Sequence, residues 1–144
     1  MVNVVILDSN FILLPFQFKI DYIDEIQFKI EGKTKYLIYR QVLDELEAKK
    51  KREPNATKFE RHFKSGLSYI EKKRKIFEIE TIEELKNDQE TTDDFLVRKA
   101  VEMKDEYKHV FLATNDSELR KKAKKLIVST IFLRKQSYID IERS

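Results

Sequence analysis

The stretch NVVILDSN, residues 3–10, decides the fold class of this chain. Four consecutive apolar residues, three of them β-branched, are typical of a strand that is buried on both faces of a parallel sheet. The strand runs directly into Asp8, which is followed by Ser9 and Asn10. A carboxylate at this place is either a turn or capping residue, or the first part of a charged site at the end of a sheet.

Strand-like and helix-like segments alternate along the rest of the chain. The sequence predicts an amphipathic helix after Pro15 and a helix that Thr92 or Asp93 caps. The alternation predicts an α/β fold with three layers, in which helices cover both faces of a central, mainly parallel sheet of four to five strands. The strands are expected at 3–8, 35–40, 76–80, 109–114 and 128–133, and the helices at 17–30, 41–51, 57–74, 93–107 and 116–125.

The composition indicates one domain over residues 1–144. Of these 144 residues 41% are hydrophobic, which is enough for one core. Cysteine is absent, so disulfides and thiolate metal sites are ruled out. No apolar run approaches the length that spans a membrane, and the first residues lack a basic leader, so a cytoplasmic location is expected.

Two acids follow the two most hydrophobic predicted strands. Asp8 ends the first strand, and Asp116 follows VFLATN. The carboxyl ends of parallel strands meet at one edge of an α/β sheet, and ligands bind there near the point where the strand order reverses. If both strands are central, the two carboxylates are expected to emerge at the same edge.

Two predicted helix starts supply further acids. Acids favour first helical turns through the helix dipole, worth roughly 0.3–1 kcal/mol each, so their presence alone does not indicate a site. Helical geometry separates the members of each pair. Glu45 borders the apolar stripe of its helix, whereas Asp44 turns toward solvent. Asp93 shares a face with apolar residues, whereas Asp94 lies about 100° around the helix from it.

The ordered segments ILDSNF, VLDELE, DDFLVRKA and VFLATNDSEL resemble the PIN domain, a family of small metal-dependent ribonucleases. The resemblance covers nearly the whole chain, from Val4 to about Leu133. It is strongest to the archaeal and eukaryotic branch related to small-subunit ribosomal RNA processing, and weaker to VapC-type toxins. Each motif is short, but four motifs in the right order and structural context make a specific signal.

The resemblance implies four catalytic and metal-binding acids. Asp8, Glu45, Asp93 and Asp116 match the family positions, with Asp94 as a substitute for the third. Oxygen ligands of this kind suit Mg²⁺ or Mn²⁺, and the sequence leaves open whether one or two ions bind. Converging carboxylates repel one another, and a divalent cation reverses that penalty. The residues expected to support the acids are Asn10, Asp94, Thr114 and Asn115.

Basic residues indicate the substrate that such a site would cut. RNA, either single-stranded or ribosomal, is the expected partner, and its phosphates would lie along basic helices. Tyr39, Phe59, Phe63 and Tyr69 are candidates for base stacking, although helical aromatics are most often core residues. The expected RNA-binding residues are Lys49, Lys50, Lys51, Arg52, Arg61, Lys64, Arg120 and Lys121.

Several alternatives share parts of this pattern. A receiver domain and a phosphatase of the haloacid dehalogenase type both need acids that this chain lacks near Asp8, where the second position after it is Asn10. A non-catalytic PIN module for RNA binding or ribosome assembly remains open, although no motif acid is missing. So does a toxin with a cognate antitoxin. The family resemblance also makes a homodimer an expected assembly.

Overall fold

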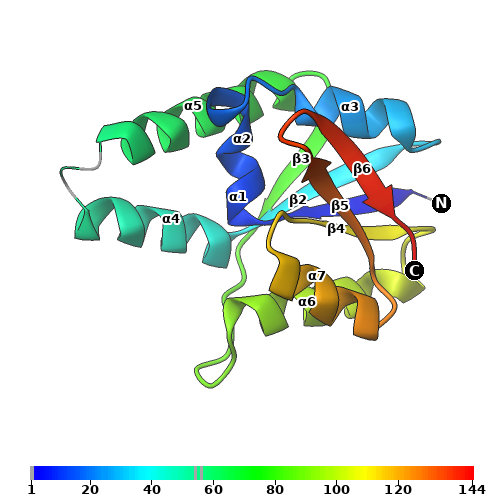
Figure 1. The fold of residues 1–144 in the computed structure, drawn as a ribbon. Helices are drawn as coiled ribbons and strands as arrows, with labels where there is room; N and C mark the ends of the chain where they lie inside the picture. The colour runs from blue at the N-terminus through cyan, green and yellow to red at the C-terminus, as the bar shows by residue number, and fades with distance from the viewer. Residues whose placement is uncertain (1, 54, 56) are drawn as a thin grey trace.

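The computed structural model describes residues 2–53, 55 and 57–144. Within them, six strands form one sheet in the order β3-β2-β1-β4-β5-β6 (Figure 1). β1 to β5 all run parallel to one another, and β6 runs antiparallel to β5. The strands are β1 (Asn3–Leu7), β2 (Thr34–Tyr39), β3 (Glu78–Ile82), β4 (Val110–Ala113), β5 (Ser129–Arg134) and β6 (Tyr138–Glu142).

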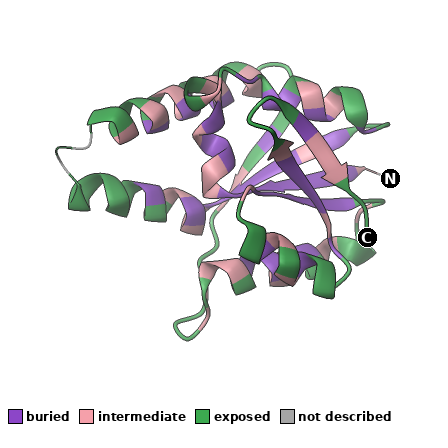
Figure 2. Cartoon of the chain, in the orientation of Figure 1, coloured by how far each residue is buried: buried purple, intermediate pink, exposed green. Residues whose placement is uncertain are grey.

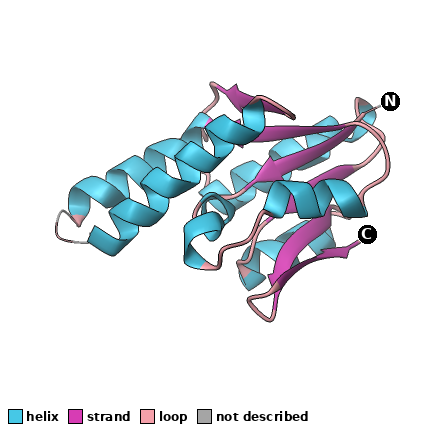
Figure 3. Ribbon diagram, turned by 90° about the horizontal axis from the view of Figure 1, so that it is seen from above, coloured by secondary structure: helices cyan, strands magenta, loops and turns pink. Residues whose placement is uncertain are grey.

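Helices cover both faces of the sheet. One face carries α1 (Ser9–Ile12), α2 (Leu14–Gln17), α3 (Tyr22–Lys29) and α5 (Thr57–Arg74), and the other carries α6 (Thr92–Glu102), the short η1 (Met103–Asp105) and α7 (Ser117–Lys125) (Figure 1). α4 (Arg40–Arg52) lies beside α5, and this pair extends beyond the carboxyl ends of the strands (Figure 3). The central strands are buried along their whole length (Figure 2). None of the described helices is both long and apolar enough to cross a membrane.

The three-layer α/β fold with a mainly parallel sheet is confirmed, but the sheet has six strands rather than four to five. β6 was not predicted, because its segment YIDIE is short and alternates between apolar and acidic residues. It pairs with β5 through a tight turn in which Lys135 and Gln136 both have φ of 54°. Hairpin turns of this kind normally contain glycine or asparagine, so the sequence carried no turn signal here.

Three predicted helix features were wrong. The expected helix 17–30 is interrupted, because Lys19 takes a left-handed φ of 56° and α3 starts only after Asp21, whose carboxylate accepts from Asp24 N. Pro15 lies in the first turn of α2 rather than breaking a helix. The cap of α6 is Thr91, one residue earlier than expected, and its Oγ1 accepts a hydrogen bond from the backbone N–H of Asp94.

Gly66 allows α5 to pack directly on α1, the helix that begins just after Asp8. A Cβ atom at Gly66 would lie 1.9 Å from the carbonyl oxygen of Ile12. We expect Gly66→Ala to lower the free energy of unfolding by roughly 1–3 kcal/mol, because forced repacking outweighs the helix propensity of alanine. Urea denaturation measures this, with the exposed Ser68→Ala on the same helix as the control. Equal stability of both variants would show that α5 can shift without cost.

Candidate active site at the carboxyl edge of the sheet

The strand order reverses between β1 and β4, and Asp8 lies at that point. From β1 the chain continues to β2 and β3 on one side of the sheet, while β4 leads to β5 and β6 on the other. Leu7 pairs with Ala113, and the backbone N–H of Asp8 donates to the Ala113 carbonyl at 3.0 Å. This register brings Asp8 and Thr114 side by side at the carboxyl edge, where open α/β sheets bind ligands.

Asp8 is held by a polar network although it is only 7% exposed. Its Oδ1 accepts from the backbone N–H of Ser9 at 2.7 Å. Its Oδ2 accepts from the hydroxyl of Thr114 at 2.7 Å and from Nδ2 of Asn10 at 3.2 Å. A buried carboxylate with three donors has a fixed orientation, and Oδ1, which accepts one hydrogen bond, keeps a lone pair for a further partner.

Asn10 and Asn115 connect this network to Asp116. Oδ1 of Asn10 accepts from the backbone N–H of Asn115 at 3.0 Å, and Oδ1 of Asn115 accepts from the N–H of Leu133 on β5 at 2.7 Å. Asp116 caps α7 through Oδ1, and its own N–H donates to Thr114 Oγ1 at 3.0 Å. Each of the residues expected to support the acids at the ends of β1 and β4 therefore makes a hydrogen bond there.

Asp93 and Asp94 face different surroundings. Asp93 is half-buried, and Asp8 and Asp116 are close enough to influence its electrostatics. Asp94 is exposed, and its Oδ1 accepts from Nζ of Lys122 at 3.1 Å. Asp93 is therefore the half-buried member of the pair, whereas Asp94 is paired with a surface lysine of α7. The role of Asp93 as the third ligand stays a prediction.

Glu45 reaches the same group of residues from α4. Its Oε2 accepts hydrogen bonds from the hydroxyl of Thr92 and, at 3.3 Å, from Nε2 of Gln41. Thr92 is the neighbour of Asp93, so this contact joins the start of α6 to α4. Thr92 was not predicted as a partner of Glu45, because a contact across 47 positions leaves no local signal in the sequence. Glu45 itself is exposed and can contact a substrate.

The acids disfavour one another's charges. Burial is the main reason why the pKa of the Asp8 carboxyl is raised; hydrogen bonds from Thr114 and Ser9 oppose the shift, and Asp93 and Asp116 add to it. Burial also raises the pKa of Asp93, with Asp116 as the largest charge contribution. Among the described residues, no three carboxylate or histidine side chains lie close enough together to hold a metal ion. The arrangement is thus a group of repelling acids at one edge rather than a closed cage.

A cavity of about 370 Å³ opens next to these acids, between α1 and α4. Asn10 and Glu45 line it at one end, and Lys49 and Arg52 line it further along α4. Phe59 also lines it, and its ring centroid lies 4.7 Å from Nζ of Lys49. We call this cavity the α4 groove. It extends from the acidic edge to two cations of α4.

The other expected RNA-binding residues are spread over several surfaces. Lys50 and Lys51 are exposed on α4, and Arg61 and Lys64 line a separate hollow between α2 and α5. Lys121 pairs with Glu118 at 3.6 Å. Arg120 lies against an aromatic ring of β5. Of the stacking candidates, Tyr39 and Phe63 are buried in the core and cannot stack on bases, whereas Phe59 and Tyr69 are half-buried.

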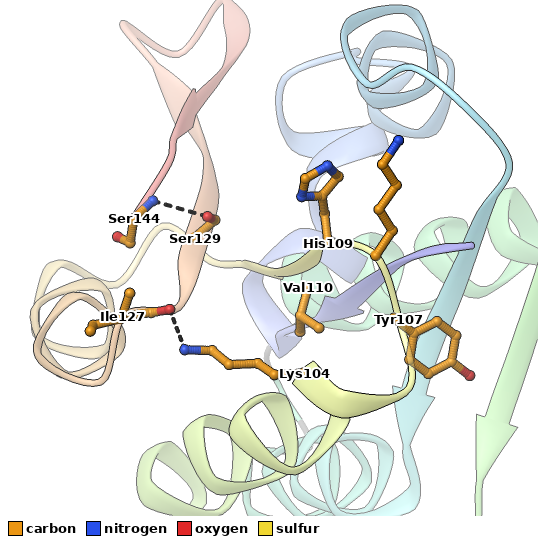
Figure 4. Close-up of a pocket in the computed structure, with 8 residues that line it drawn as sticks. Lys104, Tyr107, His109, Val110, Ile127, Ser129 and Ser144 are labelled. Carbon is orange, nitrogen blue, oxygen red and sulfur yellow. Dashed lines mark hydrogen bonds between the residues drawn. The ribbon is translucent and has the colours of Figure 1, made fainter. Parts of the chain in front are cut away.

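A second cavity, of about 280 Å³, lies at the opposite, amino edge of the strands (Figure 4). Val110 and Ser129, at the starts of β4 and β5, line it together with His109. Nζ of Lys104 donates a hydrogen bond to the carbonyl of Ile127, which follows the end of α7 (Figure 4). None of the predicted site residues lines this cavity.

Thr114 tests whether the buried network holds Asp8. Replacing it with valine removes the donor to Asp8 Oδ2 and the acceptor for Asp116 N–H. We expect Thr114→Val to lower the free energy of unfolding by about 1–3 kcal/mol, because it leaves a buried carboxylate short of a donor. Urea denaturation measures the loss, and Thr130→Val, at a buried sheet threonine not bonded to Asp8, is the control. Equal losses would show that the hydroxyl of Thr114 contributes nothing specific.

Comparisons with known proteins identify the family of this chain. The family model described as "PIN like domain" matches residues 5–136, and the chain therefore belongs to the PIN-like domain family. The structure is similar to that of the PIN domain endonuclease Utp24, with 25% identity over 98% of this chain and 92% of that one, and a TM-score of 0.68. It also resembles a domain of a functionally unknown protein from Methanocaldococcus jannaschii DSM 2661, at 18% identity, 91% coverage of each chain and a TM-score of 0.61. No curated protein matches the sequence.

Proposed function

We propose that this chain is a metal-dependent endoribonuclease that hydrolyses phosphodiester bonds of RNA, as one domain over residues 1–144. The observation that carries the proposal is the buried Asp8 at the strand reversal, with Asp93 and Asp116 contributing charge around it. Similarity to the endonuclease Utp24 across nearly the whole chain supports the same reaction class. A role in ribosomal RNA processing follows from the resemblance of the four motifs to that branch of the family.

The types of ligand at this edge suit Mg²⁺ or Mn²⁺, and the described acids would have to move closer together to hold the ion. The available ligands are carboxylate and amide oxygens, which these ions prefer. Burial and the neighbouring acids raise the pKa of the Asp8 and Asp93 carboxyls, and a bound cation would favour their charged forms. In this proposal Asp8, Asp93 and Asp116 hold the ion, and Glu45 completes the site. When bound, such an ion supplies positive charge that polarises the scissile phosphate and acidifies a water molecule.

The protein's own residues contribute orientation and proton transfer. Thr114 and Asn10 keep the Asp8 carboxylate aimed out of the sheet edge. Glu45, which lines the α4 groove, is placed to orient the attacking water and to accept its proton. The side chain of Asn115 bonds to β5 and thereby fixes the loop that contains Asp116. This bond restrains the position of Asp116 relative to Asp8.

A cleavage assay tests the proposal directly. Structured and unstructured RNA are incubated with the wild-type chain in Mn²⁺, in Mg²⁺ and in EDTA, with Asp116→Asn as the inactive comparison. We propose that cleavage requires the cation and stops in Asp116→Asn. RNA that is bound but never cut in either metal would instead identify a non-catalytic binding module.

The α4 groove predicts a specific binding defect. The double variant Lys49→Ala, Arg52→Ala removes two cations that line the groove. We expect KM to rise about tenfold with kcat nearly unchanged, and the salt slope of binding to fall by about two, since two phosphate contacts are lost. Steady-state kinetics at several salt concentrations measure both quantities. Lys33→Ala, Lys108→Ala removes the same charge at the amino edge, and an equal rise in KM there would argue against the groove.

A further inference from the structure

Phe132 on β5 supports two guanidinium groups. Its ring centroid lies 4.0 Å from Cζ of Arg120 on α7 and 5.0 Å from Cζ of Arg134 at the end of β5. The side chain of Phe132 is only 5% exposed, so the core holds the ring in place. A guanidinium packed against a fixed ring is ordered before any ligand arrives, and its N–H groups stay available for hydrogen bonds.

The cluster carries uncompensated positive charge. Nε of Arg134 donates to Oδ2 of Asp140 at 2.5 Å, so this cation has an acidic partner. In the part of the chain that the structure describes, Arg120 forms no ion pair, whereas Lys121 and Lys122 beside it on α7 both do. Arg120 and Arg134 both pack on the ring of Phe132, and Asp140 pairs with Arg134 alone. The guanidinium of Arg120 can therefore bind an anion. A phosphodiester, with two oxygens, matches its planar N–H groups.

Arg120 lies directly next to the acidic edge. Its backbone N–H donates to the carbonyl of Asp116 at 3.0 Å, so it is one helical turn further along α7. Leu133, the neighbour of Phe132, donates to Asn115, which couples β5 to the loop that holds Asp116. β5 is parallel to β4, so its end lies at the same carboxyl edge as the acids (Figure 1).

We propose that Arg120, positioned by Phe132, binds a backbone phosphate of the RNA beside the scissile one. The inference rests on the proposed function and adds a second contact to it. α4 follows β2 on one side of β1, whereas α7 follows β4 on the other side. A single strand that crosses the carboxyl edge therefore meets the α4 groove on one side of the acids and Arg120 on the other.

Binding of a fluorescently labelled single-stranded oligoribonucleotide in EDTA tests the subsite, because EDTA prevents cleavage. We expect Arg120→Ala to raise Kd roughly tenfold and to lower the salt slope by about one. Arg120→Lys should restore only part of the affinity, since lysine lacks the planar fork. Lys125→Ala removes the same charge from the same helix and should stay within about twofold of the wild type. Equal Kd values for Arg120→Ala and Lys125→Ala would overturn the proposal.

Phe132 has a separate test as a positioning residue. We expect Phe132→Leu to weaken binding in the wild-type background and to have no effect in Arg120→Ala, because it acts through that guanidinium. Additive losses would show that Phe132 matters only for folding.

A wild type that binds RNA in EDTA but never cuts it refutes the nuclease and leaves the subsite standing. Unchanged binding by Arg120→Ala, in a chain that cuts RNA, refutes the subsite alone. A wild type that does not bind the RNA refutes the subsite as well.

Discussion

Asp8→Asn is expected to lower the rate of Mn²⁺-dependent RNA cleavage by more than about 100-fold while leaving the metal-free fold at least as stable as the wild type. The side chain is 7% exposed and its pKa is raised, mainly by burial, so its charge costs stability. Asparagine keeps the size; its oxygen can still accept from the N–H of Ser9, and its amide nitrogen can donate to the hydroxyl oxygen of Thr114. Initial cleavage rates and urea denaturation in EDTA measure the two effects.

The pH dependence of stability is a second check on Asp8. The pKa of Asp8 is raised in the folded chain, so protonation of this carboxyl stabilises the fold of the wild type. This contribution to folding stability is fully present below the unfolded pKa near 3.8 and is lost as the pH rises through the folded pKa. Asparagine does not titrate. The stability difference should therefore widen in favour of Asp8→Asn as the pH rises from about 3 to about 7. A difference that narrows over this range would contradict the burial argument.

Adding Mn²⁺ distinguishes the loss of a metal ligand in Asp8→Asn from a loss of folded structure. Mn²⁺ should raise the Tm of the wild type, because a ligand that binds only the folded state stabilises it. The same addition should leave the Tm of Asp8→Asn nearly unchanged. An Asp8→Asn variant with wild-type cleavage would remove Asp8 from the catalytic machinery.

Asp93→Asn and Asp94→Asn form a matched pair, with the same chemical change at adjacent positions of one helix. We expect about a 100-fold loss of cleavage rate for Asp93→Asn, since Asp93 is half-buried and faces Asp116 and Asp8. Asp94→Asn should lose less than about threefold, because it breaks only an exposed ion pair with Lys122, worth at most about 1 kcal/mol. Initial rates at saturating Mn²⁺ compare the two variants.

The reverse order of activities would identify Asp94 as the third ligand. Asp94 would then have to leave Lys122 when substrate and metal bind. Lys122→Ala distinguishes the cases, since it frees Asp94 and leaves Asp93 in place. If Asp93 is the ligand, Lys122→Ala should leave the rate of Mn²⁺-dependent cleavage nearly unchanged; if Asp94 is the ligand, its release from the ion pair should raise that rate.

Much of the architecture was predictable because it depends on local patterns. A continuous apolar run precedes Asp8, and another precedes Asp116. Both runs predicted buried parallel strands, and both form central parallel strands of the sheet. Helical periodicity also separated Asp93 from Asp94, since burial follows the 3.6-residue repeat. The failures were local conformations without a sequence signal. The left-handed residue Lys19 split a predicted helix, and the β5–β6 turn used no glycine.

The sequence by itself determined that this chain is an α/β protein of the PIN-like family and placed acids at the ends of two central strands. Only the tertiary structure decided what surrounds them. The β1–β4 register puts Thr114 against Asp8, and the packing of α4 on the start of α6 joins Glu45 to Thr92. These contacts join residues about 50 to 100 positions apart. Their geometry depends on how strands and helices pack, so no local periodicity in the sequence could have revealed it.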